Sequence, residues 1–287
     1  MKIYSWDIKS NLNLNKDLII CLGSFETLHL GHNELFKIAR NLKNADEHFE
    51  LAAMMFQSPI NKGEIATEKA FQPKTRLYTF DALGFDSVFI VNMDKNLLNL
   101  DYKIFIQSLK ENGVKKIVCG QDFRFGFMKK GTINDLKKEF EVYVADEKKV
   151  NKSKISSTLI KEFIRDGNIE GMNALLIENY AFITTMEKFH YKYPENLIPL
   201  KDGVYIVNVV ISNIEYHGLT LINKKFESEE NKLNNILYLY DLEIIPSKYE
   251  EIYIEFIHRI RYVDDSKESK FSKSDLEIAQ RWFIENL

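Results

Sequence analysis

Short apolar runs alternate with segments of helical apolar spacing along the chain from Asp17 to about Tyr180. Continuous apolar runs are typical of strands buried on both faces of a parallel sheet, whereas a spacing of three and four is typical of helices packed on one side. The alternation therefore predicts an α/β domain, a Rossmann-like parallel sheet with helices on both faces. Two glycines, Gly113 and Gly167, are expected to end helices. The expected strands are 18–25, 51–56, 87–91, 116–120 and 141–146, and the expected helices are 32–43, 73–84, 101–113 and 156–167.

The pattern changes after Tyr180, where runs rich in aromatic and β-branched residues are joined by polar loops. Such runs are typical of antiparallel strands. We expect a second, smaller domain, an antiparallel β-barrel followed by a C-terminal helix that begins at Ser272 or Ser274. The domains are expected to span residues 1–183 and 184–287. The expected barrel strands are 203–212, 214–222, 234–245 and 249–263.

Composition narrows the class of protein. Hydrophobic residues make up 45% of the chain and charged residues 28%, as in a globular soluble protein, and the formal net charge of -3 gives no reason to expect nucleic acid as a partner. No apolar run is long enough to span a bilayer, and the first residues do not form a signal peptide. Cys21 and Cys119 lie in apolar runs and are expected to be reduced core residues. We therefore expect a cytoplasmic protein without a membrane partner.

The first chemical motif lies where an expected strand gives way to an expected helix. Two imidazoles flank a glycine there, and the helix start adds exposed backbone amides and a partial positive charge. Displacement at a phosphate needs positioned donors more than covalent help, so this segment favours nucleotide chemistry. Zinc is poorly supported, because no other His or Cys lies at ligand spacing nearby. The residues expected to bind ATP here are Gly23, Ser24, Phe25, His29, Gly31 and His32.

A second motif opens the last expected helix of this half. Ser156, Ser157 and Thr158 give three consecutive hydroxyls, and Lys161 follows one turn later. Hydroxyls at a helix start are ordinary caps, but together with a lysine they make a second phosphate-binding helix start. Two such sites on neighbouring strand ends would hold a triphosphate between them. We expect these four residues to bind ATP, with His29, His32 and Lys161 as the catalytic group.

Together the two motifs resemble the HxGH nucleotidylyltransferases, whose second motif reads roughly ISSTxIR; Lys161 stands where they carry Arg, so the charge is kept but the bidentate fork is lost. The segment 120–126, GQDFRFG, followed by Lys129-Lys130-Gly131, resembles the GxDFRFG segment of the bacterial bifunctional riboflavin kinase/FAD synthetases. The resemblance implies that AMP is transferred from ATP to FMN, with Mg²⁺ on the phosphates and Asp122 as a metal ligand. The residues it implies for FMN binding are Phe56, Gln57, Pro59, Asp122, Phe123, Arg124 and Phe125.

The second half keeps the framework of the family's kinase domain but departs from its chemical motifs. The family's PTAN motif appears as YPEN at 193–196, without the threonine, and the stretch ahead of it contains no glycine. The family's catalytic Glu aligns near Tyr238. We therefore expect riboflavin kinase activity to be lost or weak.

The most favoured function is therefore FAD synthesis from FMN, with ATP and FMN as small-molecule substrates. Three alternatives remain open. In the first, the chain is a fully bifunctional enzyme that also uses riboflavin. In the second, it is another HxGH nucleotidylyltransferase, and in the third, a catalytically silent flavin- or nucleotide-binding module.

Overall fold

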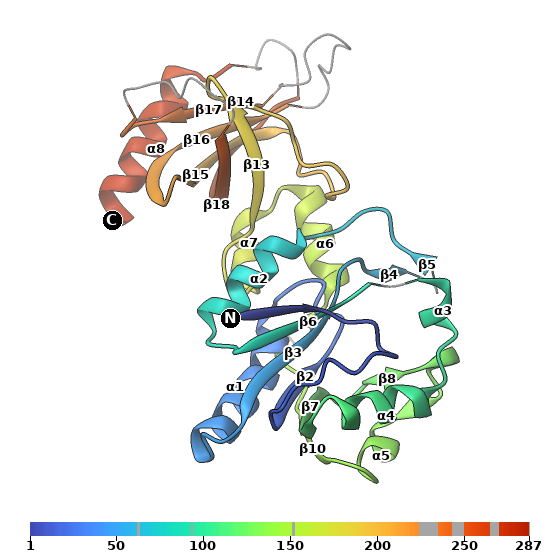
Figure 1. Cartoon of the computed structure of the whole chain (residues 1–287). Helices are drawn as coiled ribbons and strands as arrows, with labels where there is room; N and C mark the ends of the chain where they lie inside the picture. The colour runs from blue at the N-terminus through green and yellow to red at the C-terminus, as the bar shows by residue number, and fades with distance from the viewer. Residues whose placement is uncertain are drawn as a thin grey trace. The chain divides into compact units, whose positions relative to one another are not determined.

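The computed structural model describes residues 1–61, 64–92, 94–150, 153–223, 235–242, 250–264 and 270–286. The chain forms two compact units (Figure 1). The first comprises residues 1–69 and 76–157, and the second comprises residues 70–75 and 158–287.

The first unit is built on a six-stranded sheet in the order β1-β6-β3-β2-β7-β10, and every neighbouring pair is parallel. This confirms the predicted α/β fold. The central strand β2 is buried along its whole length, as its continuous apolar sequence predicts. The sheet strands are β1 Lys2–Ser5, β2 Leu18–Leu22, β3 Glu50–Phe56, β6 Ser87–Val91, β7 Val114–Gly120 and β10 Glu141–Ala145.

The chain up to residue 173 also contains helices and three small hairpins, of which α6 after Ser157 and α7 belong to the second unit. Gly113 and Gly167 adopt positive φ angles of 79° and 63° just after helices, as predicted for caps. The helices are α1 Leu30–Ala45, α2 Pro73–Ala82, α3 Lys95–Leu98, α4 Tyr102–Glu111, α5 Ile133–Leu136, α6 Ser157–Asp166 and α7 Ile169–Asn173, with a 3₁₀ turn at Phe127–Lys129. The hairpins pair β4 Ile60–Asn61 with β5 Glu64–Ile65, β8 Arg124–Phe125 with β9 Gly131–Thr132, and β11 Lys149–Val150 with β12 Ser153–Lys154.

The strand order places a topological switch point between β2 and β7. From β2 the chain proceeds to β3 and β6 on one side, and it later returns to β7 and β10 on the other. In open parallel sheets, ligands bind outside the carboxyl ends of the strands where the winding direction reverses. The segment that starts at Gly23 follows β2, and the segment 120–126 starts at the end of β7. The fold thus puts two of the predicted binding segments at this switch point.

The predicted strand 18–25 is too long. Strand β2 ends at Leu22, and Phe25 adopts a φ of 44°, which no strand residue has. Phe25 is nevertheless fully buried, because its ring packs against Phe36 and Phe80 at centroid distances of 5.3 and 5.7 Å. An apolar residue of the loop therefore looked like a strand residue in the sequence.

The second unit contains a closed barrel in the order β13-β14-β17-β16-β15-β18, followed by helix α8, as predicted. Its core includes large aromatic side chains, among them Tyr180, Phe182, Tyr191, Tyr205 and Phe256. The elements are β13 Ala181–Glu187, β14 His190–Tyr191, β15 Gly203–Ile211, β16 Ile214–Ile222, β17 Asn235–Leu239, β18 Glu250–Tyr262 and α8 Lys273–Asn286. The expected boundary after residue 183 falls inside β13, and residues 234, 243–245 and 249 of the expected strands lie outside the described residues.

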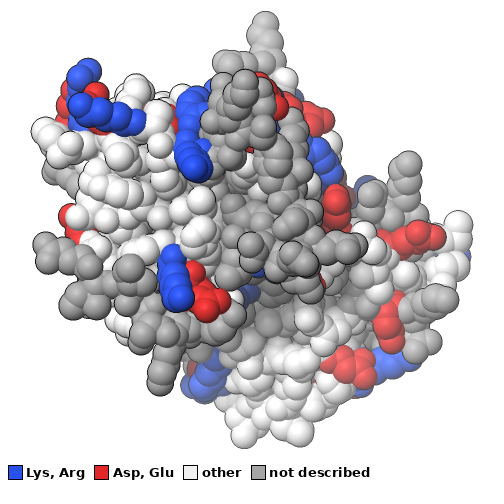
Figure 2. All heavy atoms as spheres, turned by 90° about the horizontal axis from the view of Figure 1, so that it is seen from above, with Lys and Arg blue, Asp and Glu red and all other residues white. Residues whose placement is uncertain are grey.

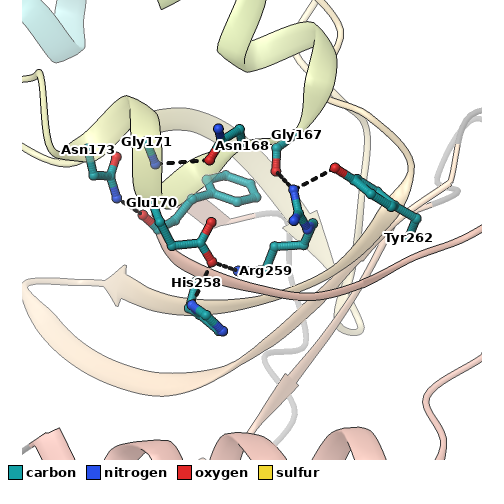
Figure 3. Close-up of polar contacts among 9 residues, drawn as sticks. Gly167, Asn168, Glu170, Gly171, Asn173, His258, Arg259 and Tyr262 are labelled. Carbon is teal, nitrogen blue, oxygen red and sulfur yellow. Dashed lines mark hydrogen bonds and ion pairs between the residues drawn. The ribbon is translucent and has the colours of Figure 1, made fainter. Parts of the chain in front are cut away.

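Within the second unit, strand β18 holds the carboxyl end of α6 (Figure 3). Arg259 Nη1 donates to the Gly167 carbonyl at 2.8 Å, as Figure 3 shows. The Tyr262 hydroxyl donates to the Asp166 carbonyl at 2.9 Å. The last carbonyls of a helix lack partners inside the helix, so these donors satisfy groups that would otherwise need water. The adjacent α7 joins the same network, since Glu170 accepts from the Arg259 amide at 2.9 Å and pairs with His258 at 2.6 Å. The helix that opens with the second motif is therefore fixed to the barrel at its other end.

The surface and the cysteines fit the expectations from composition. Among the described residues on the face shown in Figure 2, basic and acidic side chains lie intermixed. Cys21 and Cys119 are both buried and free. In the part of the chain that the structure describes, none of the helices has the length and hydropathy needed to cross a membrane.

Candidate active site

The two histidines of the first motif form a compact pair at the start of α1. His29 caps the helix, and its Nδ1 accepts a hydrogen bond from the His32 backbone amide at 3.3 Å. The two rings are stacked, with centroids 3.8 Å apart and an angle of 14° between the planes. Because His29 Nδ1 is an acceptor, a neutral His29 carries its hydrogen on Nε2. His29 is thereby set up as a hydrogen-bond donor at its outer nitrogen.

Both imidazoles are neutral at pH 7. Burial, with a smaller contribution from the charge of Lys154, lowers the pKa of His29 to about 4. Burial likewise holds the pKa of His32 well below its usual value, and His29 and Lys154 add to the effect. The pair can therefore donate hydrogen bonds to phosphate oxygens, but the positive charge of the site has to come from other residues.

The glycine between the histidines is required by the position of the His29 ring. A Cβ at Gly31 would lie 3.0 Å from ring atoms of His29, which is closer than nearly all real Cβ contacts. A Cβ at Gly23 would likewise lie 2.8 Å from the Phe25 ring. Both glycines leave room for rings that shape the loop.

The two sequence motifs meet through a direct contact. The hydroxyls of Thr27 and Ser157 share a hydrogen bond of 2.9 Å, and Thr27 is fully buried. Of the remaining predicted residues, Ser24 is exposed and Ser156 is half-buried in the first unit, whereas Thr158 is exposed and Lys161 half-buried on α6 in the second.

The segment after β7 offers one aromatic face and one carboxylate. Phe123 and Phe125 stack with centroids 5.7 Å apart, but Phe125 is a core residue that also packs on Phe105. Phe123 is only partly buried, and Arg124 is exposed and donates to the Phe123 carbonyl at 2.9 Å. The aromatic surface available to a ligand therefore comes from Phe123 more than from Phe125. The other predicted flavin residues follow β3: Phe56 is half-buried, Gln57 exposed and Pro59 buried.

One charged residue near the site, Lys154, was not predicted from the sequence. Lys154 Nζ pairs with Asp122 at 2.7 Å and with Glu147 at 3.2 Å. The hydrogen bond from Lys154 is the main cause that lowers the pKa of Asp122, and Lys154 also acts on both histidines. Lys154 stands just before the hydroxyl motif in the sequence, which is the signal that could have identified it. It supplies a cation beside the neutral imidazoles.

The described residues contain no group of three His, Cys, Asp or Glu side chains that could hold a metal ion alone. Magnesium needs no such group when phosphates are present, because it is usually bound by one or two carboxylates together with phosphate oxygens and water. Asp122 is an exposed carboxylate at the end of β7 and fits that limited role.

A paired-histidine helix start at the switch point of a parallel sheet suits the phosphates of a nucleotide, and the family and the relatives that the chain matches identify the protein as a nucleotidyltransferase. The chain belongs to the FAD synthetase family, because the family model described as FAD synthetase matches residues 12–159. This confirms the resemblance found in the sequence.

Several relatives match nearly the whole chain. A bifunctional riboflavin kinase/FMN adenylyltransferase of Buchnera aphidicola subsp. Acyrthosiphon pisum is 29% identical, over 94% of this chain and 95% of its own length. The protein of the same description from Listeria monocytogenes is 25% identical, over 93% and 90%. A crystal structure of a macrolide-efflux protein from Streptococcus pneumoniae is similar with a TM-score of 0.78 and 23% identity, covering 99% of this chain and 97% of that one. At that identity the structural likeness supports the fold alone.

Proposed function

We propose that the protein is an FMN adenylyltransferase that transfers AMP from ATP to FMN, giving FAD and pyrophosphate. The observation that carries the proposal is the Thr27–Ser157 contact of 2.9 Å, which joins the paired-histidine loop to the hydroxyl-bearing helix start. The names of the relatives support FMN as the acceptor, since they describe FMN adenylyltransferases.

In the proposed mechanism, the phosphates of ATP lie beside the loop of residues 23–32 and the hydroxyls of Ser156 and Ser157, which belong to the same unit. An FMN phosphate oxygen attacks the α-phosphorus in line; a new P–O bond forms, the bond to the β-phosphate oxygen breaks, and pyrophosphate leaves. The neutral His29, from its Nε2, and the neutral His32 donate to oxygens that gain charge in the transition state. Lys154 and Lys161 supply positive charge, and Mg²⁺, when bound with Asp122, would neutralise the phosphates.

We further propose that riboflavin kinase activity is lost or weak. Tyr193, at the start of the altered PTAN motif, is occupied within the domain, because its hydroxyl donates to the Ile198 carbonyl at 2.9 Å and accepts from the Leu200 amide at 3.1 Å. The stretch ahead of the motif contains no glycine, and Lys188 and Phe189 adopt positive φ angles in its turn. Tyr238, at the register of the family's catalytic Glu, is 41% exposed on β17 and carries a phenol, which is a poor general base at pH 7.

One experiment tests both parts of the proposal. The purified protein is incubated with ATP and Mg²⁺, once with FMN and once with riboflavin, and the flavins are separated by chromatography. FAD from FMN alone is the expected result. FAD or FMN from riboflavin would overturn the loss of kinase activity, and no FAD from FMN would overturn the adenylyltransferase assignment.

The variant His32→Ala tests the role of the histidine pair. It removes one donor of the pair, so we expect FAD formation to fall by about a hundredfold while the circular dichroism spectrum stays unchanged. Normal turnover by this variant would count against the mechanism.

A further inference from the structure

A buried arginine connects two loops that the proposed mechanism assigns to different substrates. Arg76 lies on α2 and is 2% exposed. Its Nη1 donates to the Phe25 and Phe56 carbonyls, each at 2.9 Å, and its Nη2 donates to the Gln57 carbonyl at 3.2 Å. Phe25 belongs to the nucleotide loop after β2, whereas Phe56 and Gln57 lie at the end of β3, on the predicted FMN side.

The two loops also touch directly at this point. The Phe56 amide donates to the Ser24 carbonyl at 3.2 Å, beside the carbonyls that Arg76 holds. The strands β2 and β3 are neighbours in the sheet, so their carboxyl ends leave side by side. One guanidinium group therefore fixes the backbone direction in which both chains leave the sheet.

Burying the Arg76 guanidinium costs desolvation free energy, and a residue needed only for packing would not require a charge. The side-chain hydrogen bonds recorded for Arg76 go to carbonyls, and its Nε is buried without a partner. Burial lowers the pKa of Arg76 to about 10, with Glu26 acting in the opposite direction, so the group stays charged at pH 7. An apolar side chain would fill the same volume without the desolvation cost of a charge. An apolar side chain could not, however, bind three carbonyls from two loops, as the rigid planar guanidinium of Arg76 does.

We propose that Arg76 is a positioning residue for the adenylyl transfer, which holds the nucleotide loop and the FMN loop in a fixed relation to each other. The inference rests on the proposed function. Arg76 touches neither substrate in this role; it acts through the carbonyls of Phe25, Phe56 and Gln57. Because it orders both loops, its loss should weaken the use of ATP and of FMN together.

The test compares three variants in steady-state kinetics with each substrate varied in turn. Arg76→Met removes the charge and all three hydrogen bonds, and Arg76→Lys keeps the charge but loses the fork. Phe85→Leu is the control for stability, since Phe85 is buried against Phe36 and Phe80 and contacts neither loop through a hydrogen bond that the structure records. Thermal unfolding of all three sets an assay temperature at which each is folded.

We expect kcat/KM for ATP and for FMN to fall together, by about a hundredfold in Arg76→Met and at least about tenfold in Arg76→Lys, because small misplacements of reacting groups cost rates of this size. Phe85→Leu should lose thermal stability and keep both values within about twofold of the wild type. If Arg76→Met does not fold, the Arg76→Lys result decides. Normal kinetics in the folded Arg76 variants, a loss confined to one substrate, or an equal loss in Phe85→Leu would each overturn the proposal.

Failure of the proposed function would give a different result. If the wild type makes no FAD from FMN, the adenylyltransferase assignment fails, and equilibrium dialysis with ATP alone then tests Arg76. Weaker ATP binding in Arg76→Lys than in Phe85→Leu would keep Arg76 as the organiser of the nucleotide loop. Equal binding in these two variants would overturn that role too.

Discussion

Acidification should destabilise the protein through the neutral histidine pair. A histidine in the unfolded chain titrates near pH 6.5, whereas the pKa of His29 in the folded protein is lowered to about 4 by burial. Between these two values the unfolded chain binds more protons than the folded one. Stability therefore rises with pH in this window and is lost as the pH falls from 6.5 towards 4. Burial of His32 acts in the same direction.

The size of the effect follows from the shift. The full change in the pKa of His29 corresponds to about 3 kcal/mol, of which about 2 kcal/mol falls between pH 7 and pH 5. Urea unfolding followed by circular dichroism at both pH values measures the difference for the wild type. The variant His29→Asn keeps a residue that can cap α1 but removes the titrating ring.

We expect the loss of stability between pH 7 and pH 5 to be about 2 kcal/mol smaller in His29→Asn than in the wild type. Carboxylates that titrate at low pH are common to both proteins and cancel in the comparison. Equal pH dependence of the two proteins would refute the conclusion that the folded protein holds His29 neutral.

Three further predictions concern Gly31, Asp275 and the two cysteines. Gly31→Ala should push the His29 ring from its place, since the new Cβ would lie 3.0 Å from it, and should lower FAD formation about a hundredfold with an unchanged circular dichroism spectrum. Asp275→Asn should cost about 3 kcal/mol in urea unfolding, because Asp275 is 2% exposed and accepts two hydrogen bonds of 2.9 Å from Arg261. A thiol reagent at pH 8 should label Cys21 and Cys119 only after unfolding, since burial raises the pKa of both thiols, to about 11 for Cys119.

The parallel sheet could be predicted from the sequence because buried strands read as continuous apolar runs. All five residues of β2 are buried, and β6 was predicted with its observed ends. The edge strand β1, Lys2–Ser5, gave no such signal, since three of its four residues are exposed. Strand signals in this protein therefore follow burial, and an edge strand lacks it.

The motifs of the site could be identified from residue type and spacing, but their physical state could not. His29 and His32 are chemically ordinary in the sequence, and it is mainly their burial in the fold that lowers their pKa values. The role proposed for Arg76 depends on carbonyls at residues 25, 56 and 57, which any sequence provides. Their convergence on one guanidinium exists only in the fold.

The hydrogen bonds from β18 to the end of α6 affect what happens when the chain is cut at the boundary expected after residue 183. A chain shortened after that residue would keep α6 and discard β18, so the carbonyls of Asp166 and Gly167 would lose the Tyr262 and Arg259 donors that the structure records for them. Such a truncated chain would test two things at once: whether the end of α6 stays folded without these donors, and whether the first half of the chain folds without the barrel. The helix α6 and the barrel strand that holds its end belong to the same unit, so a shortened form of the protein should keep or discard them together.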